Sequence, residues 1–160
     1  MKIRTGLGQD SHRFLASDSQ KACIIGGIFF EEVPGFVANS DGDVVLHAIC
    51  NAITSVGGLK VLGGIADDLL KKNGIVDSKV YLKHALDSLG RQTVSHIAIS
   101  IEAKRPNFGN RIEKMRETIA NIMSLEISQV GITATSGEGL TAFGRGDGVQ
   151  AFVIMTTCEE

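Results

Sequence analysis

The strongest folding constraint in this sequence is a stripe of apolar residues with helical spacing. Polar residues come before the stripe, and glycines come after it. Its side chains recur every three or four residues: Val45, Ala48, Ile49, Ala52, Ile53 and Val56. Asn39 or Ser40 is suited to cap a helix that begins near Asp41. Asp43 follows Ser40 by three residues, in the manner of a capping box. Gly57-Gly58 stops the pattern, so the sequence predicts one helix whose apolar face is covered by other elements.

Segments with the character of strands lie on both sides of this helix. The predicted strands are residues 2–7, 22–25, 28–31, 94–103, 129–135 and 150–157. Gly26-Gly27 suits a tight hairpin turn between the second and third of them. Two further helices are predicted at about 77–89 and 110–124. No linker or repeat divides the chain, so we expect residues 1–160 to form a single α+β domain, with a mixed β-sheet and helices on one face.

Composition excludes several classes of partner. The net charge is −2 and charges of both signs are mixed along the chain, which disfavours a basic surface for nucleic acid. No apolar run approaches the roughly 20 residues that span a bilayer, and the N-terminus lacks the apolar region of a signal peptide. Cys23, Cys50 and Cys158 have no metal-knuckle or disulfide-framework spacing. We therefore expect a cytoplasmic protein that binds neither nucleic acid nor membrane.

Three residues form a candidate metal site. Asp10 and His12 come just after the first predicted strand, and alternate residues of an extended chain point the same way. A carboxylate and an imidazole suit zinc, manganese or iron, and His47 adds a third ligand while leaving a fourth position open. The alternatives are a solvated turn for the first pair and a histidine that donates to a carbonyl for the third. His84 lies among exposed helix positions and His96 alternates with apolar residues of a strand, so neither is assigned to the site.

A glycine-rich connector at 135–148 is a candidate phosphate site. Glycine lets backbone N–H groups approach phosphate oxygens closely, and Thr135 and Ser136 add hydroxyl donors. Glu138 is suited to hold a hard cation such as Mg²⁺ that bridges phosphates. The segment does not match a P-loop, and an ordinary connector has the same composition.

Five motifs in this order resemble the 2-C-methyl-D-erythritol 2,4-cyclodiphosphate synthase family of the non-mevalonate isoprenoid pathway. They are G-x-D-x-H-R-F at 8–14, I-I-G-G at 24–27, S-D-G-D-V-x-L-H-A at 40–48, D-S at 77–78, and T-S-x-E-x-L with G-R-G-D-G at 135–148. The motifs cover almost the whole chain, and the run at 40–48 is the most specific of them.

The resemblance implies a lyase that converts 4-diphosphocytidyl-2-C-methyl-D-erythritol 2-phosphate to 2-C-methyl-D-erythritol 2,4-cyclodiphosphate and CMP. It implies one Zn²⁺ per subunit on Asp10, His12 and His47, with Mn²⁺ as an alternative, and Mg²⁺ or Mn²⁺ with the substrate diphosphate. It also implies a cyclic homotrimer with active sites shared between neighbours. An axial cavity of that trimer would hold an isoprenoid diphosphate.

The same resemblance implies roles for individual residues. Asn39, Ser136 and Glu138 would be catalytic, and Arg145 would lie near the threefold axis. The residues implied in substrate binding are Asp10, His12, Asn39, Ser40, Ala103, Lys104, Arg105, Pro106, Asn107, Ala134, Thr135, Ser136, Glu138 and Arg145.

The sequence departs from the family pattern at four places. Asn39 stands where the family commonly has histidine, and Ser136 stands where it has threonine. Asn107 replaces a lysine and so removes a positive charge from the expected nucleotide pocket. The loop expected after the first helix lacks the aspartate that usually holds the erythritol hydroxyls, and either Asp67 or Asp68 compensates or that contact is lost.

Two other functions fit the same residues. One is a metal-stabilised module that binds a phosphorylated ligand without turnover. The other is a structural trimer in which the His-Asp set is a stabilising zinc clip. The open fourth ligand position and Glu138 favour the enzyme.

Overall fold

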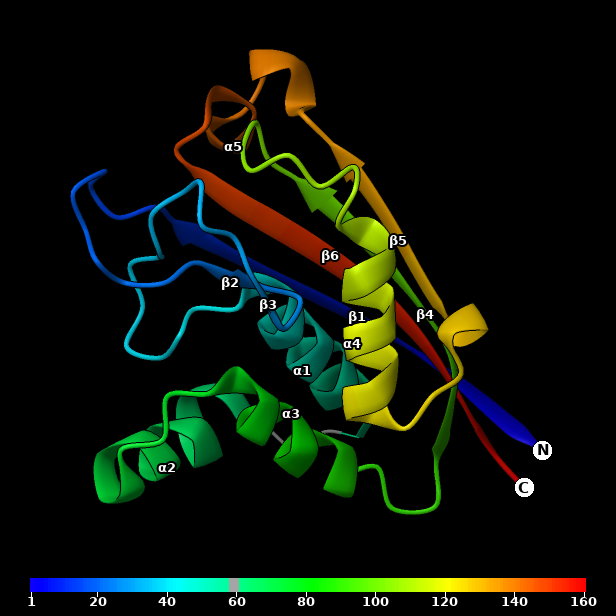
Figure 1. The fold of residues 1–160 in the computed structure, drawn as a ribbon. Coiled ribbons are helices and arrows are strands. Elements are labelled where there is room, and N and C mark those ends of the chain that lie inside the picture. The colour runs from blue at the N-terminus through cyan, green and yellow to red at the C-terminus, as the bar shows by residue number, and fades with distance from the viewer. Residues whose placement is uncertain (58–60) are drawn as a thin grey trace.

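A four-stranded sheet forms the frame of the fold, and the computed structural model describes it within residues 1–57 and 61–160. The strands are β1 (Lys2–Arg13), β6 (Gly148–Glu159), β4 (Thr93–Glu102) and β5 (Val130–Thr135), in that spatial order. β6 is antiparallel to both β1 and β4, whereas β5 is parallel to β4. The predicted mixed sheet is therefore confirmed. The pairing of β1 with β6 brings the two termini side by side (Figure 1).

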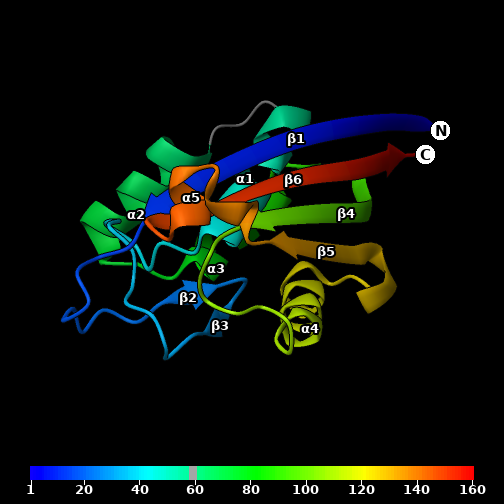
Figure 2. The same ribbon diagram turned by 90° about the horizontal axis from the view of Figure 1, so that it is seen from above.

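One face of the sheet is covered by helices and the other is open. Figure 1 and Figure 2 show α1 (Val44–Gly57), α3 (Ser78–Asp87) and α4 (Ile112–Met123) on the same side of the four strands. Side chains of β4 and β6 alternate between buried and exposed along the strands. The open face carries Leu7 and Ile154, which are 60% and 51% exposed. The predicted single α+β domain with helices on one face is thus what the structure shows.

The strand β1 and the helix α1 meet at backbone contact distance. A Cβ atom placed on Gly6 would lie 2.2 Å from the carbonyl oxygen of Ala52, and one on Gly8 would lie 2.0 Å from that of Ala48. Real Cβ atoms do not approach other atoms so closely, so only glycine fits at these two positions. Packing of the first strand against the helix therefore explains this glycine pair.

The buried carboxylate of Asp43 joins the start of α1 to the hairpin. It accepts the backbone N–H groups of Val45 and Leu46, each at 3.1 Å, which makes Asp43 itself the helix cap. It also accepts the N–H groups of Gly26 at 2.9 Å and Gly27 at 2.7 Å. Burial raises the pKa of this carboxyl to about 6, although the backbone donors act in the opposite direction. The predicted helix start near Asp41, capped by Asn39 or Ser40, was wrong by three residues.

The hairpin is shorter than predicted, but its turn is where the sequence placed it. β2 is Ile24–Ile25 and β3 is Ile28–Phe29. Gly26 and Gly27 have φ angles of 61° and 77°, a backbone region that glycine enters without steric cost. The backbone N–H of Phe30 donates to the carbonyl of Cys23 at 2.9 Å, and the chain turns away from the hairpin after this bond.

The segment after α1 was expected to be a loop, and that expectation was wrong from Ala66 onward. Val61–Ile65 is a kinked turn in which Leu62 and Gly63 have non-helical backbone angles, and the helix α2, Ala66–Asn73, follows it. Two acidic residues begin α2 and two lysines end it, which suits the helix dipole, and Gly74 closes it with a φ of 66°. Gly63 and Gly64 hid this helix in the sequence. Gly58 of the predicted helix stop lies outside the described residues.

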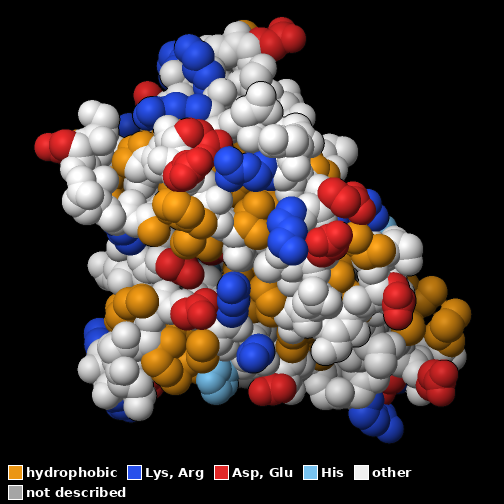
Figure 3. All heavy atoms as spheres, viewed as in Figure 1, with side chains coloured by type: hydrophobic (Ala, Val, Ile, Leu, Met, Phe, Trp, Pro, Cys, Tyr) orange, Lys and Arg blue, Asp and Glu red, His pale blue; other side chains and the backbone are white. Residues whose placement is uncertain are grey.

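Three short segments complete the described elements. They are a 3-10 turn at Ile127–Gln129, a tight turn at Gly137–Gly139 whose residues all have positive φ angles, and α5 (Ala142–Arg145). The last two lie within the glycine-rich connector between β5 and β6. No described helix is by itself long and apolar enough to cross a membrane. One bent pair, α1 with Val61–Asn73, has the length and the apolar composition of a membrane span, and nothing beyond these two properties points to one. Figure 3 shows acidic and basic side chains interspersed on the face that carries α3 and α4.

Candidate active site

Asp10, His12 and His47 point their ligand atoms at one another. Asp10 Oδ2 lies 2.9 Å from His12 Nε2 and 3.2 Å from His47 Nδ1, and the two ring nitrogens are 3.1 Å apart. Asp10 and His12 lie within β1, paired with β6, so their predicted place just past a strand was wrong. Their predicted convergence is confirmed, since the alternation of the strand turns both side chains toward α1.

The triangle of ligand atoms has the size of one face of a tetrahedral metal site. Metal–ligand bonds of about 2.0 Å place tetrahedral ligands about 3.3 Å apart, close to the distances between these three atoms. Among the described residues, Asp10, His12 and His47 form the one group of three or more His, Cys, Asp or Glu side chains that is close enough together to hold a metal ion. The site therefore fits a divalent cation with one coordination position left for a ligand.

The electrostatics of Asp10 suit a metal ligand. Burial raises the pKa of its carboxyl, but hydrogen bonds with His12 and His47 outweigh burial and bring the pKa down to about 2. Asp10 is therefore a carboxylate at neutral pH. Cation binding requires this ionised form.

A cavity of about 270 Å³ opens beside the three ligands. Asn39 and Ser40, both predicted site residues, line it together with Asp10, His12 and His47. The other lining residues come from the loop before α1, from the segment after it and from α3: Ala38, Leu62, Gly63, Ala66, Asp67, Leu70 and Tyr81. Of these, the sequence pointed only to Asp67, as one of two alternatives. Five of the seven belong to the segment after α1, where the helix α2 was not predicted.

The structure separates the two aspartates that begin α2. Asp67 lines the cavity beside the metal ligands. Asp68 is exposed and forms an ion pair with Lys72 at 3.6 Å, one helical turn further on. Of the two, only Asp67 is placed to meet a ligand in that cavity.

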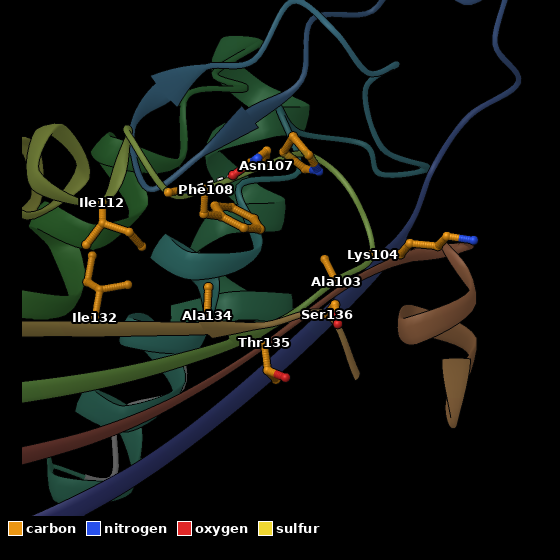
Figure 4. A pocket seen from close by; sticks show the side chains of 11 residues that line it. Ala103, Lys104, Asn107, Phe108, Ile112, Ile132, Ala134, Thr135 and Ser136 are labelled. Atoms are coloured by element: carbon orange, nitrogen blue, oxygen red, sulfur yellow. Dashed lines mark hydrogen bonds between the residues drawn. The ribbon is translucent and has the colours of Figure 1, made fainter. Parts of the chain in front are cut away.

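A second cavity of about 470 Å³ lies at the ends of β4 and β5 (Figure 4). Seven of the residues implied in substrate binding line it: Ala103, Lys104, Pro106, Asn107, Ala134, Thr135 and Ser136. Phe108, Gly109, Ile112 and Ile132 form the rest of the wall and were not predicted. Figure 4 shows Ala134 pointing toward Phe108 from the end of β5, while the Thr135 side chain points to the other side of the strand. Asn107 accepts the backbone N–H of Gly109 at 2.9 Å.

Three predicted residues lie outside both cavities. Arg105 stacks on Phe14, with its guanidinium carbon 4.8 Å from the ring centre, and donates to the carbonyl of Gly146. Arg145 is exposed beside the glycine-rich connector. Glu138 is also exposed, and its φ of 49° is unusual for a residue other than glycine. Backbone strain of this kind is often retained at functional positions.

The two cavities stand at opposite edges of the sheet. Asp10 on β1 pairs with Ala151 on β6, Ala151 pairs with Ile101 on β4, and Ile101 pairs with Ala134 on β5. Asp10 and Ala134 therefore lie in one row, three strand spacings or about 14 Å apart. No residue lines both cavities in the described chain. Within one chain, the metal ligands and the second cavity belong to separate surfaces.

A family model described as the YgbB family matches residues 3–158. The chain belongs to the YgbB family. Among curated members, the 2-C-methyl-D-erythritol 2,4-cyclodiphosphate synthase of Chlamydia muridarum is 58% identical over 157 residues, which cover 98% of this chain and 88% of that protein. The enzyme of the same description from Chlamydia caviae is 55% identical, with coverage of 98% and 89%.

Solved structures of family members have the same fold. The bifunctional IspDF of Campylobacter jejuni superposes with a TM-score of 0.88 at 27% identity, over 99% of this chain and 43% of that longer one. A 2C-methyl-D-erythritol-2,4-cyclodiphosphate synthase in a CDP-bound form superposes with a TM-score of 0.80 at 25% identity, over 97% of this chain and all of that one. The resemblance read from the motifs is confirmed.

Proposed function

We propose that this YgbB-family chain converts 4-diphosphocytidyl-2-C-methyl-D-erythritol 2-phosphate to 2-C-methyl-D-erythritol 2,4-cyclodiphosphate and CMP, in the non-mevalonate route to isoprenoids. An oxygen of the 2-phosphate forms a bond to the β-phosphorus, and the bond from that phosphorus to the oxygen bridging it to the α-phosphorus breaks. CMP leaves with the bridging oxygen. The observation that carries this proposal is the His-His-Asp triangle beside a cavity, in a chain 58% identical to a synthase of that name.

Positioning accounts for most of the catalysis in this proposal. An intramolecular phosphoryl transfer requires the nucleophile and the phosphorus in line and the phosphate charges offset. The side chains of Asn39 and Ser40 line the metal cavity and would donate hydrogen bonds to the reacting phosphates. Ser136 would donate to the phosphate from the neighbouring site, and Glu138 would hold a second cation. These roles rest on the motifs and on the exposure of Ser136 and Glu138.

Asp10, His12 and His47 would hold zinc, one ion per subunit, with manganese as an alternative. Two neutral nitrogen donors and one carboxylate are the donor set of many zinc sites. Zinc there, with Mg²⁺ or Mn²⁺ at Glu138, would supply positive charge to the diphosphate oxygens.

Asp67 would replace the aspartate that the family uses to hold the erythritol hydroxyls. It projects into the metal cavity from the first turn of α2, whereas Asp68 pairs with Lys72 in solvent. The second cavity, with the loop Ala103–Asn107 on one side and Ala134–Ser136 on the other, would hold the cytidine part. A CDP-bound relative supports a cytidine nucleotide as the ligand class.

A cyclic homotrimer would bring the two halves of the site together. The metal ligands and the cytidine cavity stand about 14 Å apart in one chain, which favours completion of each site by a neighbour. The open sheet face has an apolar hollow of about 510 Å³ that includes Leu7, Phe152 and Ile154. Exposed apolar areas of this kind mark interfaces. In the trimer this face would line an axial cavity, with Arg145 near its end for an isoprenoid diphosphate.

We further propose residues 1–160 as one catalytic domain acting in the cytoplasm. The three cysteines are free, as a reducing compartment requires. Incubation of the purified protein, zinc and Mg²⁺ with the cytidine substrate should release CMP and the cyclic diphosphate in equal amounts. Binding of the substrate without CMP release would favour a metal-stabilised binding module. Zinc content without either binding or turnover would favour a structural zinc clip.

A further inference from the structure

The two ring nitrogens of His47 have different neighbours. Nδ1 faces the candidate metal position, 3.1 Å from His12 Nε2 and 3.2 Å from Asp10 Oδ2. Nε2 lies 2.8 Å from the hydroxyl oxygen of Ser78 at the start of α3. A neutral imidazole carries its hydrogen on one nitrogen and a lone pair on the other. The groups around Nε2 therefore decide whether Nδ1 has a lone pair for a metal.

The hydroxyl hydrogen of Ser78 is already committed to a carboxylate. Ser78 Oγ donates to Oδ1 of Asp41 in a short hydrogen bond. The other oxygen of Asp41 accepts the backbone N–H of Ser78 at 3.0 Å, and Oδ1 also accepts the N–H of Asp43 at 3.0 Å. Asp41 and Ser78 are thereby fixed to each other by two bonds. Since a hydroxyl has one hydrogen, Ser78 has only lone pairs to offer to His47.

Ser78 requires a hydrogen on Nε2 of His47, and the competing acceptor at Nδ1, the Asp10 carboxylate at 3.2 Å, can take a hydrogen from His12 Nε2, which is closer at 2.9 Å. A lone pair on Nε2 would face a lone pair of Ser78 at 2.8 Å, whereas an Nε2–H group donates to it. We propose that Asp41 and Ser78 are positioning residues that hold His47 as the Nε2–H tautomer and so direct the lone pair of Nδ1 to the metal. The role of the metal rests on the proposed function, whereas the hydrogen-bond chain does not.

Burial makes this chain of hydrogen bonds effective. Ser78 is fully buried and His47 is 8% exposed, so water has little access to replace either partner. Ser40 Oγ, which accepts the N–H of Gly42, also approaches Nε2, but its distance of 3.5 Å is at the limit of a hydrogen bond. The contact with Ser78 is the shorter by far and therefore sets the orientation of the ring.

The tautomer is measurable in metal-free protein by ¹⁵N NMR of the histidine rings at about pH 8.5, above the ordinary imidazole pKa of about 6.5. We expect His47 to be protonated at Nε2 in the wild type, while the exposed His84 and His96 show averaged tautomers. Ser78→Ala should remove this preference. Asp41→Asn should move it toward Nδ1–H, because an amide can donate to Ser78 and free the hydroxyl hydrogen for Nε2. An Nδ1–H tautomer in the wild type, or an unchanged His47 in both variants, would overturn the proposal.

Zinc affinity, measured by competition with a chelator, tests the consequence for the site. Ser78→Ala should weaken zinc binding roughly 10- to 100-fold, the usual effect of removing a partner of a metal-bound histidine. The matched control is Ser88→Ala at the other end of α3, where the hydroxyl donates to the carbonyl of Ala85 at 2.6 Å. The control should keep wild-type affinity. An equal loss in both variants, or no loss in Ser78→Ala, would show that the chain does not position the ligand.

His47→Ala separates this inference from the proposed function. If zinc still binds normally to His47→Ala, the metal assignment has failed. The role of the hydrogen-bond chain is then tested by the NMR measurement of the His47 tautomer alone. If His47→Ala loses zinc while Ser78→Ala retains it fully, the metal site stands and the positioning role of Ser78 has failed.

Discussion

Asp10 and Ala134 occupy the same row of the sheet at its two opposite edges. If each active site takes its metal half from one chain and its loop half from the next, two differently damaged variants should complement each other. We expect His47→Ala and Glu138→Ala to be inactive alone and to regain activity when refolded together. Each mixed ring has one interface with two intact halves, so random mixing should restore up to about a quarter of wild-type activity. CMP release measures the recovery.

The matched control for complementation uses two variants with damage in the same half. Refolding His47→Ala with Asp10→Ala should restore nothing, because no interface then has an intact metal half. Activity in this control would mean that the variants are not truly inactive. If the first mixture stays inactive although mixed trimers form, both halves belong to one chain.

The metal assignment predicts a loss of zinc on removal of one ligand. The wild-type protein should contain about one zinc ion per chain, as a three-ligand site with an open position would hold. His47→Ala should contain almost none and should release no CMP. His84→Ala, which changes an exposed histidine on α3, should keep both metal and activity. Elemental analysis after removal of loosely bound metal gives the answer, and a full zinc content in His47→Ala would contradict the assignment.

Asn107 in the second cavity predicts weak binding of the substrate phosphates. A lysine at this position would add a positive charge beside the cytidine diphosphate, so Asn107→Lys should lower KM about threefold to tenfold with kcat unchanged. Asn121→Lys adds the same charge on an exposed position of α4, away from the cavity, and should leave KM unchanged. An unchanged or raised KM in Asn107→Lys would argue against this placement of the nucleotide.

The four backbone donors around Asp43 predict a large loss of stability when the carboxylate is removed. Asp43→Ala leaves the N–H groups of the helix start and of the hairpin turn buried without acceptors, at a cost of about 3 to 5 kcal/mol. Asp77→Ala removes the exposed cap of α3, which accepts one N–H from Lys79, and should cost only about 1 kcal/mol. Denaturant unfolding of the two variants compares these costs. Similar losses would show that the hairpin contacts contribute little.

Burial of two cysteines predicts selective thiol chemistry. Burial raises the pKa of Cys23 and of Cys50 to about 12, with nearby carboxylates adding to the shift, so both stay protonated and unreactive at neutral pH. Cys158 is partly exposed. A thiol reagent that gives a coloured product should therefore react with about one thiol in the native protein and with all three after unfolding. Rapid reaction of two or three native thiols would contradict the packing around α1.

The sequence predicted elements well where local pattern and tertiary packing agree. The stripe that begins at Val45 and the alternation of Ile97, Ile99 and Ile101 face the core in the structure as expected. The sequence failed where a tertiary contact determines the local structure. Asp43 caps α1 because the hairpin glycines share its carboxylate, and a local capping rule contains no information about that contact.

The candidate site shows the same division. Asp10, His12 and His47 were predicted because carboxylate and imidazole groups identify metal ligands by type and spacing. Ser78 and Tyr81 were not, because serine and tyrosine are common and their relation to His47 depends on how α3 packs against α1. The D-S pair at 77–78 was noted as a motif, and its position at a helix start is the one local signal that pointed to Ser78.

The contact of Gly8 with the backbone of α1 has a consequence for how the molecule responds to its metal. β1 carries two ligands and α1 carries the third, and these two elements touch with no side chain between them. They cannot slide or separate without losing this close backbone packing. The ligand triangle is therefore preorganised, and apo and holo forms should share one shape. The ion would act as a permanent part of the electrostatic framework, not as a conformational switch.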